Sequence, residues 1–371
     1  MVQANRRGSR WCASGIAWWI IHASAFACGA DSAPAGFEGE NDAHEEASDT
    51  DSADSEADVS IPDPAPGTVG GVCTVDEDCP AGTWCSTVSG FERCAPRLFE
   101  GDPHQMDFAF VPGGSFQQGT PDVTNEERAY TATLTRNYFV SRTELTQGQW
   151  QAATGGVNPS CFQNTSGTSC GSDDANDSGP VEQVDWYSAV AYVNWLSSQN
   201  GLQPCYSLSG CSDESSGWHD GEHDGCASAT FEGPGCTGYR LLTESEWEHA
   251  ARGGTTSTYY WGEAMDETTV AQHAWFSSNS GNRTQAVGQK LTNGYGLYDV
   301  CGNVQEWVWD WYSSSYPSGR ATDHLGPSTG SSRGVRGGGS SASLLRSARR
   351  NSLDPTLRSS DLGLRVARTI P

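Results

Sequence analysis

The sequence predicts an α+β domain with little regular secondary structure, preceded by a small disulfide-stapled module. Its 371 residues include 44 Gly and 17 Pro, and only 36% are apolar, which is typical of many turns around one main core. Fourteen Trp supply the large apolar side chains that such a core needs. Four Cys lie close together between Cys73 and Cys94, which indicates a unit stapled by disulfides.

Residues 1–28 have the composition of an export signal. A basic stretch ending at Arg10 precedes the apolar run 15–21, which is too short for a convincing membrane-spanning helix. The motif Ala-Phe-Ala-Cys ending at Cys28 resembles a bacterial lipoprotein processing site, at which Cys28 would be lipidated; plain secretion is the alternative. We therefore expect an outer-membrane or cell-surface lipoprotein, a periplasmic protein or a secreted one, with membrane contact only through a lipid anchor.

Residues 29–70 are expected to form an acidic, disordered linker. Twelve acidic residues and no Lys or Arg lie between Asp31 and Asp63, and the formal net charge of the whole chain is -25. Few large apolar side chains are present to offset the entropy of ordering this segment. Nucleic acid is excluded as a partner because binding phosphates needs clustered cations, and Lys290 is the only lysine.

Residues 71–97 form the small Cys-rich module. It is too short to bury an apolar core, so two disulfides must stabilise it instead. Three pairings are open among Cys73, Cys79, Cys85 and Cys94. The alternative, a zinc knuckle, requires closer C-x2-C spacing and usually histidine. Later cysteines predict three further cross-links, one from Cys161 with Cys170 and two from Cys205, Cys211, Cys226 and Cys236.

The main domain, residues 105–371, begins with strand patterns. The run 107–119 reads as a strand, a Pro-Gly-Gly turn and a second strand, and the run 138–144 reads as a third strand. Thr146 then predicts the N-cap of a helix that carries Trp150.

Two further helices are expected. Apolar residues recur at three- and four-residue intervals in 184–196, which predicts an amphipathic helix buried through Trp186, Val190, Val193 and Leu196. The next helix follows Leu242. Thr243 can cap it while Glu246 reaches back in a capping box, and Trp247 belongs to its buried stripe.

Two segments carry a resemblance to a known family. Residues 239–254 read YRLLTESEWEHAARGG and residues 294–307 read GYGLYDVCGNVQEW, and together they resemble the hallmark pair of the formylglycine-generating enzyme, or sulfatase-modifying factor, family. The motifs FVPGGSF, RGGGS and LGLRVAR match in the same order, so the resemblance covers residues 105–371. It implies a complex α+β fold of the C-type-lectin type. It also implies an oxidase that converts a substrate cysteine into formylglycine with O2 and Cu(I) held by two thiolates.

The thiolate pair of that family is missing here. The family's oxidases have two Cys spaced C-x4-C just after a Gly-Gly-Ser, whereas residues 336–346 read RGGGSSASLLR. A serine hydroxyl such as that of Ser340 is neither soft nor appreciably ionised near neutral pH, so copper binding and this oxidation are expected to be lost. Cys301 is a lone thiol, which we interpret as a small buried apolar residue. An active tailoring enzyme with other oxidative chemistry is the alternative.

The resemblance also implies a structural calcium site. The carboxylates of Asp299 and Glu306 would close around the ion, with the backbone carbonyls of Gly302 and Val304 between them. For the family's second calcium site, only Asn279 falls near a matching position. The alternative is that the two carboxylates cap local backbone groups.

Two other groups of polar residues could form sites. Arg336, Ser340, Arg346 and Arg349 could line the cleft that holds a peptide in the family's oxidases, and could recognise an acidic ligand. Alternatively, these arginines, with Arg350 and Arg365, pair with the surplus carboxylates.

The segment HDGEH places His219 and His223 four residues apart, as in a metal-binding helix, although a solvated loop pinned by disulfides fits its composition better. Together these patterns predict an exported, calcium-stabilised domain that binds a peptide, a glycan or an envelope protein, or that has a structural role in the envelope.

Overall fold

The fold is described from a computed structural model. The described residues are 70–74, 76–79, 83–88, 91–98, 105–121, 127–162, 176–211, 226, 228–338 and 342–370. The predicted signal with Cys28, nearly all of the predicted linker, and Cys170, His219, His223 and Ser340 lie outside these ranges. None of the helices within them has the length and apolar content that a membrane crossing requires.

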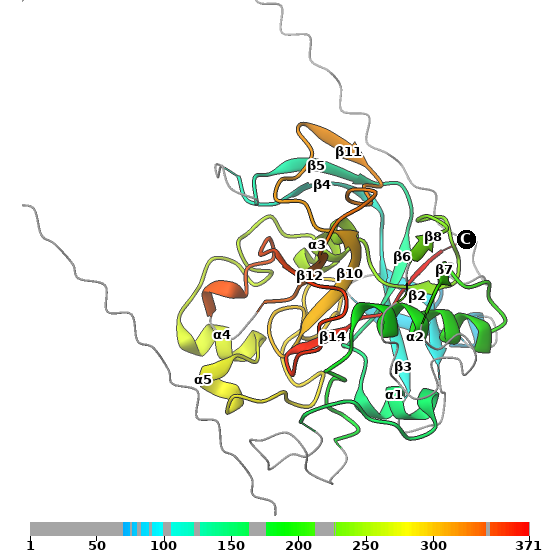
Figure 1. The fold of residues 1–371 in the computed structure, drawn as a ribbon. Helices are drawn as coiled ribbons and strands as arrows, with labels where there is room; N and C mark the ends of the chain where they lie inside the picture. The colour runs from blue at the N-terminus through cyan, green and yellow to red at the C-terminus, as the bar shows by residue number, and fades with distance from the viewer. Residues whose placement is uncertain are drawn as a thin grey trace, which may run out of the picture. The chain divides into compact units, whose positions relative to one another are not determined.

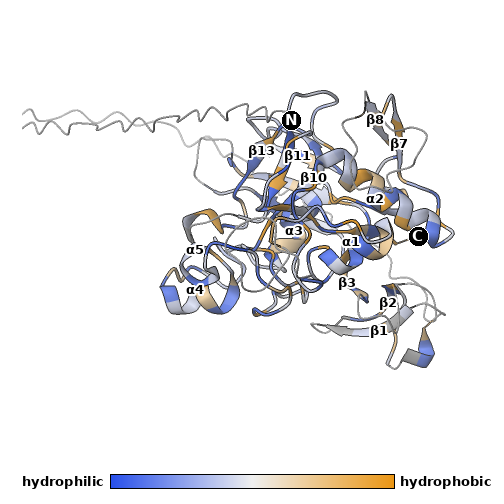
Figure 2. Ribbon diagram, turned by 60° about the horizontal axis from the view of Figure 1, so that its bottom comes forward, coloured by the Kyte–Doolittle hydropathy of each residue, from blue (hydrophilic) through white to orange (hydrophobic). Residues whose placement is uncertain are grey.

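The largest sheet unites the Cys-rich module with the main domain. Its six strands are antiparallel to their neighbours, in the order β1 (Thr83–Val88), β2 (Phe91–Leu98), β3 (Met106–Val111), β6 (Tyr138–Ser141), β15 (Ala367–Thr369) and β9 (Tyr239–Arg240). The module's hairpin, β1 and β2, joins the domain where Leu98 pairs with Met106 (Figure 2). The module is therefore an extension of the domain's own sheet.

The disulfides confirm the predicted cross-linking where they are described. Of the three pairings open in the module, the structure has Cys73–Cys85 and Cys79–Cys94, so the zinc alternative has no free thiol there. The later pairs are Cys205–Cys236 and Cys211–Cys226. Cys161 is also disulfide-bonded. Within the described ranges, Cys301 is the only free cysteine.

Three smaller sheets complete the strands. A four-stranded sheet has the order β13 (Asn351–Leu353), β12 (Arg333–Arg336), β10 (Gln305–Trp311) and β14 (Leu362–Leu364), with β10 and β14 parallel. A three-stranded sheet contains β11 (Arg320–Thr322), β5 (Tyr130–Leu134) and β4 (Gly114–Gln118), and a hairpin contains β7 (Tyr206–Ser209) and β8 (Ser228–Phe231). These short sheets between long loops confirm the α+β prediction (Figure 1).

The three longer helices begin within two residues of the predicted positions, whereas the shorter ones were not predicted. The longer ones are α1 (Gln147–Thr154), α2 (Trp186–Gln199) and α3 (Glu244–Arg252), and the shorter ones are α4 (Glu267–His273), α5 (Ser277–Ser280) and the 3-10 turns at Asp76–Asp78 and Ala342–Leu344. Thr146 caps α1, and Thr243 with Glu246 forms the predicted capping box on α3. α3 lies against β10, the strand that leads into the candidate site (Figure 1).

Buried tryptophans connect α2 to β10. The Trp186 indole donates a hydrogen bond to the Val308 carbonyl (2.9 Å), and the Trp307 indole donates one to the Val184 carbonyl (2.8 Å). The Arg333 guanidinium lies over the ring of Trp186, 3.6 Å from its centroid. These contacts satisfy indole donors that burial would otherwise leave unpaired, and they fix the start of β10.

Candidate ligand-binding site

The loop 299–304, just before β10, adopts a backbone that few residues allow. Gly302 has φ +93, and a Cβ there would lie 2.1 Å from the Trp275 carbonyl oxygen. The Gly302 N–H donates to the Gly337 carbonyl (2.6 Å), and the Asn303 N–H donates to the Trp275 carbonyl (3.0 Å). The loop is therefore held between the segments that contain Trp275 and Gly337.

Glu306 is bound by a cation from the protein itself. It is fully buried, and its Oε1 lies 2.8 Å from one terminal nitrogen of the buried Arg365 guanidinium, while Arg365 Nε donates at 2.9 Å. The Trp247 indole donates to Glu306 Oε2 at 2.7 Å. Both carboxylate oxygens are thus engaged by donors.

Two other buried carboxyl groups share this region. Asp299 Oδ2 accepts the Gly288 N–H (2.7 Å), whereas Oδ1 has no hydrogen-bond partner among the described residues; burial raises the pKa of Asp299 to about 6. Glu144 accepts the Val304 N–H (3.0 Å) and the Asn303 amide (2.7 Å). Burial, and then the charges of Asp299 and Glu306, raise the pKa of Glu144 well above its ordinary value. Glu144 was not found from the sequence because it lies more than 150 residues before the loop that it supports.

The predicted calcium ligands fit an ion poorly. Of the three predicted side-chain ligands, only Asp299 keeps an oxygen without a partner in the described part of the chain. Glu306 is engaged by Arg365, and Asn279 is used locally, accepting the Phe276 N–H (2.8 Å) and donating to the Ala274 carbonyl. Among the described residues, Glu144, Asp299 and Glu306 do not bring their oxygens together as one ligand set. Calcium at this loop stays a prediction.

The predicted arginine cluster pairs with carboxylates. Arg336 is buried and donates to Glu248 (2.5 Å) and to the Ala348, Arg349 and Ser347 carbonyls. Arg350 makes two hydrogen bonds of 2.7 Å to Glu244. The half-buried Arg346 and Arg349 both pair with the buried Glu127. The alternative weighed from the sequence, pairing with carboxylates, therefore describes these side chains.

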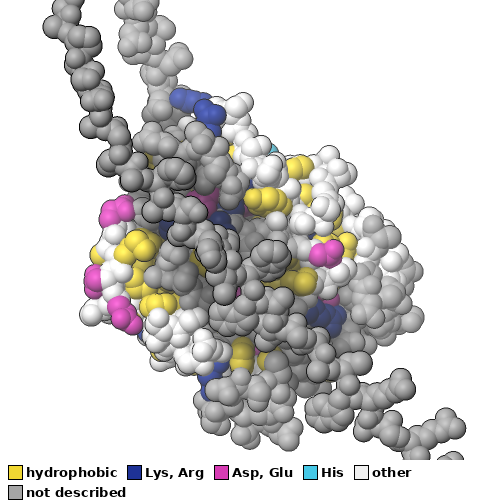
Figure 3. Space-filling model, turned by 60° about the vertical axis from the view of Figure 1, so that its left-hand side comes forward, with side chains coloured by type: hydrophobic (Ala, Val, Ile, Leu, Met, Phe, Trp, Pro, Cys, Tyr) yellow, Lys and Arg dark blue, Asp and Glu magenta, His cyan; other side chains and the backbone are white. Residues whose placement is uncertain are grey.

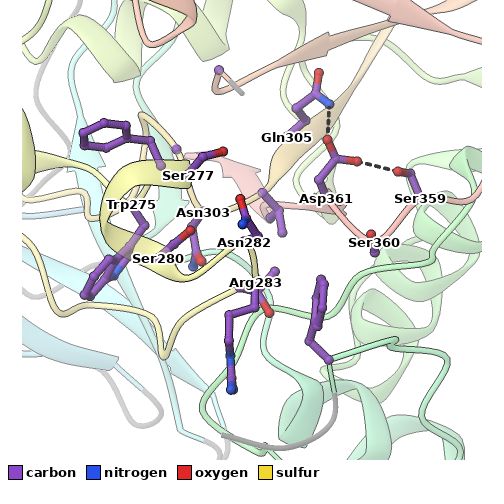
Figure 4. A pocket seen from close by; sticks show the side chains of 16 residues that line it. Trp275, Ser277, Ser280, Asn282, Arg283, Asn303, Gln305, Ser359, Ser360 and Asp361 are labelled. Atoms are coloured by element: carbon purple, nitrogen blue, oxygen red, sulfur yellow. Dashed lines mark hydrogen bonds between the residues drawn. The ribbon is translucent and has the colours of Figure 1, made fainter. Parts of the chain in front are cut away.

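Two cavities that share lining residues form a cleft beside the loop. The larger is about 400 Å³ and lies between the segment 275–284, the loop residues 302–305 and the segment 359–361 (Figure 4). The smaller, about 160 Å³, shares Gln305, Gly338 and Asp361 with it and is also lined by Arg336, Arg349 and Asn351. A separate cavity of about 520 Å³ near the start of α1 contains none of the predicted site residues.

A chain of polar side chains joins the two cavities. The Asn351 amide donates to Gln305 Oε1 (2.8 Å), and the Gln305 amide donates to Asp361 Oδ2 (3.1 Å). The Ser359 hydroxyl donates to the other oxygen of Asp361 (Figure 4). These two hydrogen bonds fix the orientation of the Asp361 carboxylate. Because Asp361 is exposed, the carboxylate also remains accessible to a ligand.

Aromatic residues also line the larger cavity. Phe162, Trp275 and Phe276 line it, and the Lys290 ammonium lies 3.5 Å from the centroid of the Trp275 ring. Lys290 also donates to the Ala271 carbonyl (2.6 Å), and partial burial lowers its pKa. The sequence did not reveal this cavity because its residues come from separate loops and carry no periodic pattern.

The face drawn in Figure 3 has no large region of one charge among the described residues, and its apolar side chains lie in several separate groups. No pair of thiols lies in the described ranges, where Cys301 is the one free cysteine, 1% exposed. Burial raises the pKa of the Cys301 thiol, which disfavours the thiolate that binds copper.

Comparisons with known proteins agree with this fold. The chain is 31% identical over 222 residues to the protein named chaperone protein LppX of Paenibacillus barcinonensis, covering 56% of this chain and 72% of that protein. It is 29% identical over 294 residues to a formylglycine-generating enzyme of Streptomyces coelicolor, covering 73% and 90%. The solved structure of Treponema denticola variable protein 1 matches at a TM-score of 0.63 with 32% identity, covering 74% and 98%. PvdO from Pseudomonas aeruginosa matches at 0.54 with 25% identity, covering 73% and 97%.

A family model described as the sulfatase-modifying factor enzyme 1-like domain matches residues 96–370, a range that includes α1 to α5, the loop 299–304 and the cleft. This match and the solved relatives confirm the resemblance that the sequence motifs carried. The chain belongs to the sulfatase-modifying factor family.

Proposed function

We propose that this protein is an exported member of the sulfatase-modifying factor family that binds a ligand in the cleft and does not carry out copper-thiolate oxidation. The absence of copper-thiolate oxidation is inferred from the sequence of residues 336–346, where hydroxyl and aliphatic side chains replace the thiols. Copper(I) requires soft ligands, and a serine hydroxyl is not one. The one free thiol in the described ranges is buried.

The cleft supports a binding function because it combines shape with fixed polar groups. Its larger cavity, about 400 Å³, is within the size range of small-molecule sites. The Asp361 carboxylate is oriented by Gln305 and Ser359, so a ligand would meet a preorganised acceptor.

Export is supported by the residues of the predicted signal and by the disulfides. Four disulfides are described in full, and such bonds persist in oxidising compartments. Mass spectrometry of the mature N-terminus would distinguish a lipidated Cys28 from a plain cleaved end. An unprocessed N-terminus on protein recovered from the producing cells would contradict export.

The loss of oxidation is tested directly. Purified protein is incubated with Cu(I), O2 and a peptide containing Cys-x-Pro-x-Arg, and the peptide mass is followed. We expect no change of mass, while the Streptomyces coelicolor relative, assayed in parallel, serves as the positive control. A mass loss that matches aldehyde formation would refute the proposal and favour the alternative, an active oxidoreductase.

A further inference from the structure

We infer that the larger cavity of the cleft binds a neutral sugar, as one or two rings, through side-chain hydroxyl, amide and carboxylate groups. This inference rests on the proposed function, since it names the ligand of the same cleft. It depends on four features of the cavity: its lining, the state of its backbone groups, its aromatic side and the fixed carboxylate of Asp361.

The lining is rich in uncharged hydrogen-bonding side chains. Of its 16 residues, eight carry a hydroxyl or amide: Ser277, Ser280, Asn282, Thr284, Asn303, Gln305, Ser359 and Ser360. Only Arg283 and Asp361 are charged. A ligand with a formal charge would find one opposing group at most, whereas a ligand with several hydroxyl groups would find uncharged donors and acceptors.

The backbone N–H groups of residues 302–305, beside the cavity, are already used. The N–H groups of Gly302, Asn303, Val304 and Gln305 all donate within the protein, and the last of these bonds the Asp361 carbonyl at 2.7 Å. β10 is flanked on both sides by β12 and β14, so it offers no free edge in this region. An extended peptide binds chiefly through such an edge. A peptide would therefore find no donor in the backbone of residues 302–305 and no strand edge at β10, which favours a sugar bound through side chains.

Two kinds of side chain remain available to a ligand. Within the described residues, the side chains of Ser277, Asn282 and Ser360 have no hydrogen-bond partner, and all three are at least partly exposed. Asp361 forms no ion pair with a described Lys or Arg. A carboxylate has two oxygens that can accept from two neighbouring hydroxyl groups at once, and here both oxygens are already oriented.

The aromatic side supplies the apolar contact that the carbon face of a sugar ring needs. Phe162, Trp275 and Phe276 line the cavity, and Trp275 lies across it from Asp361 (Figure 4). The cation–π contact from Lys290 restrains the Trp275 ring, so less side-chain entropy would be lost on binding. A pocket with an apolar side and a few oriented polar groups is the usual arrangement of a small-molecule site.

The test uses the full chain and saturation-transfer NMR, followed by titration. The probes are glucose, galactose, mannose, N-acetylglucosamine and their β-linked disaccharides, with tetraglycine and tetraalanine as peptide probes. We expect at least one neutral sugar to bind, and Asp361→Ala to weaken it by about tenfold, the loss that follows from removing a hydrogen bond to a charged acceptor. Asn282→Ala is expected to weaken it as well.

Asp354→Ala is the matched control, because Asp354 is also an exposed carboxylate, but it does not line the cavity and, among the described residues, its side chain accepts hydrogen bonds only from Thr356. It should leave affinity unchanged. Asp361→Asn keeps the shape of the side chain and checks that loss of binding is not loss of fold. Binding of no sugar in the panel, or binding that survives Asp361→Ala, overturns the inference. Binding of a peptide probe that Asp361→Ala weakens overturns the sugar class but leaves a ligand-binding cleft, whereas copper-dependent peptide oxidation overturns the proposed function independently.

Discussion

Replacing Glu306 by Gln should destabilise the domain strongly, both with calcium and with a chelator present. The substitution removes the negative charge that faces the buried Arg365 guanidinium at 2.8 Å, while the Trp247 indole can still donate to the new side chain. Breaking a fully buried ion pair costs about 3–5 kcal/mol because the remaining charge is left uncompensated. For a domain of this size each kcal/mol lowers the melting temperature by roughly 2–4 °C, so a fall of roughly 6–20 °C is expected.

The measurement is thermal and urea unfolding of wild type and Glu306→Gln, each with added calcium and with a chelator. Arg136→Ala is the control, because the Arg136 side chain is 46% exposed, so its pair with Asp323 should contribute about 0–1 kcal/mol. A loss below about 1 kcal/mol for Glu306→Gln would refute the reasoning from burial. A wild type that gains stability from calcium when the variant does not would show that Glu306 is a metal ligand after all.

Three further predictions concern pH and backbone geometry. Burial lowers the pKa of His249 to about 4, so as pH falls the unfolded chain binds a proton at this residue before the folded chain does. Folding stability should therefore fall between about pH 6.5 and about pH 4. His249→Gln should abolish that part of the pH dependence of unfolding. Burial raises the pKa of Glu182 to about 7, so the contribution of Glu182 to folding stability is greatest below pH 4.5 and is lost as pH rises through 7. Glu182→Gln should therefore reduce the difference in unfolding free energy between pH 5 and pH 8. An unchanged difference would contradict this. Gly302→Ala should unfold at a much lower temperature than Gly281→Ala, since both have positive φ but only the first meets a backbone atom; equal melting temperatures would argue against the close approach.

Local chemistry could be predicted from the sequence because its partners lie a few residues apart. The N-cap at Thr146, the capping box at Thr243 and the buried positions Trp186, Val190, Val193 and Leu196 of α2 depend on neighbours within one or two turns, and the structure has them as expected. The family motifs likewise gave the fold, because several segments match in one order.

The partners of the charged residues could not be predicted in the same way. Glu306 and Arg365 are 59 residues apart and meet only because β10 and β14 pair. The sequence alone did not show that Arg365 neutralises the Glu306 carboxylate, and it therefore favoured a calcium ion there. The strands that complete the largest sheet, β9 and β15, have two and three residues, too few for a period-two pattern. The cavity was missed because its lining comes from loops.

The union of the Cys-rich hairpin with the main sheet has a mechanical consequence. Any force applied to the chain ahead of Gly70 first reaches a hairpin in which Cys73 is linked to Cys85 and Cys79 to Cys94, so that hairpin cannot be pulled open by extension. The load then passes to the hydrogen bonds between β2 and β3, at the edge of a six-stranded sheet that also contains β15 near the C-terminus. Reducing agents should therefore lower the force at which the protein begins to extend, by allowing the hairpin to unzip before the rest of the sheet is strained.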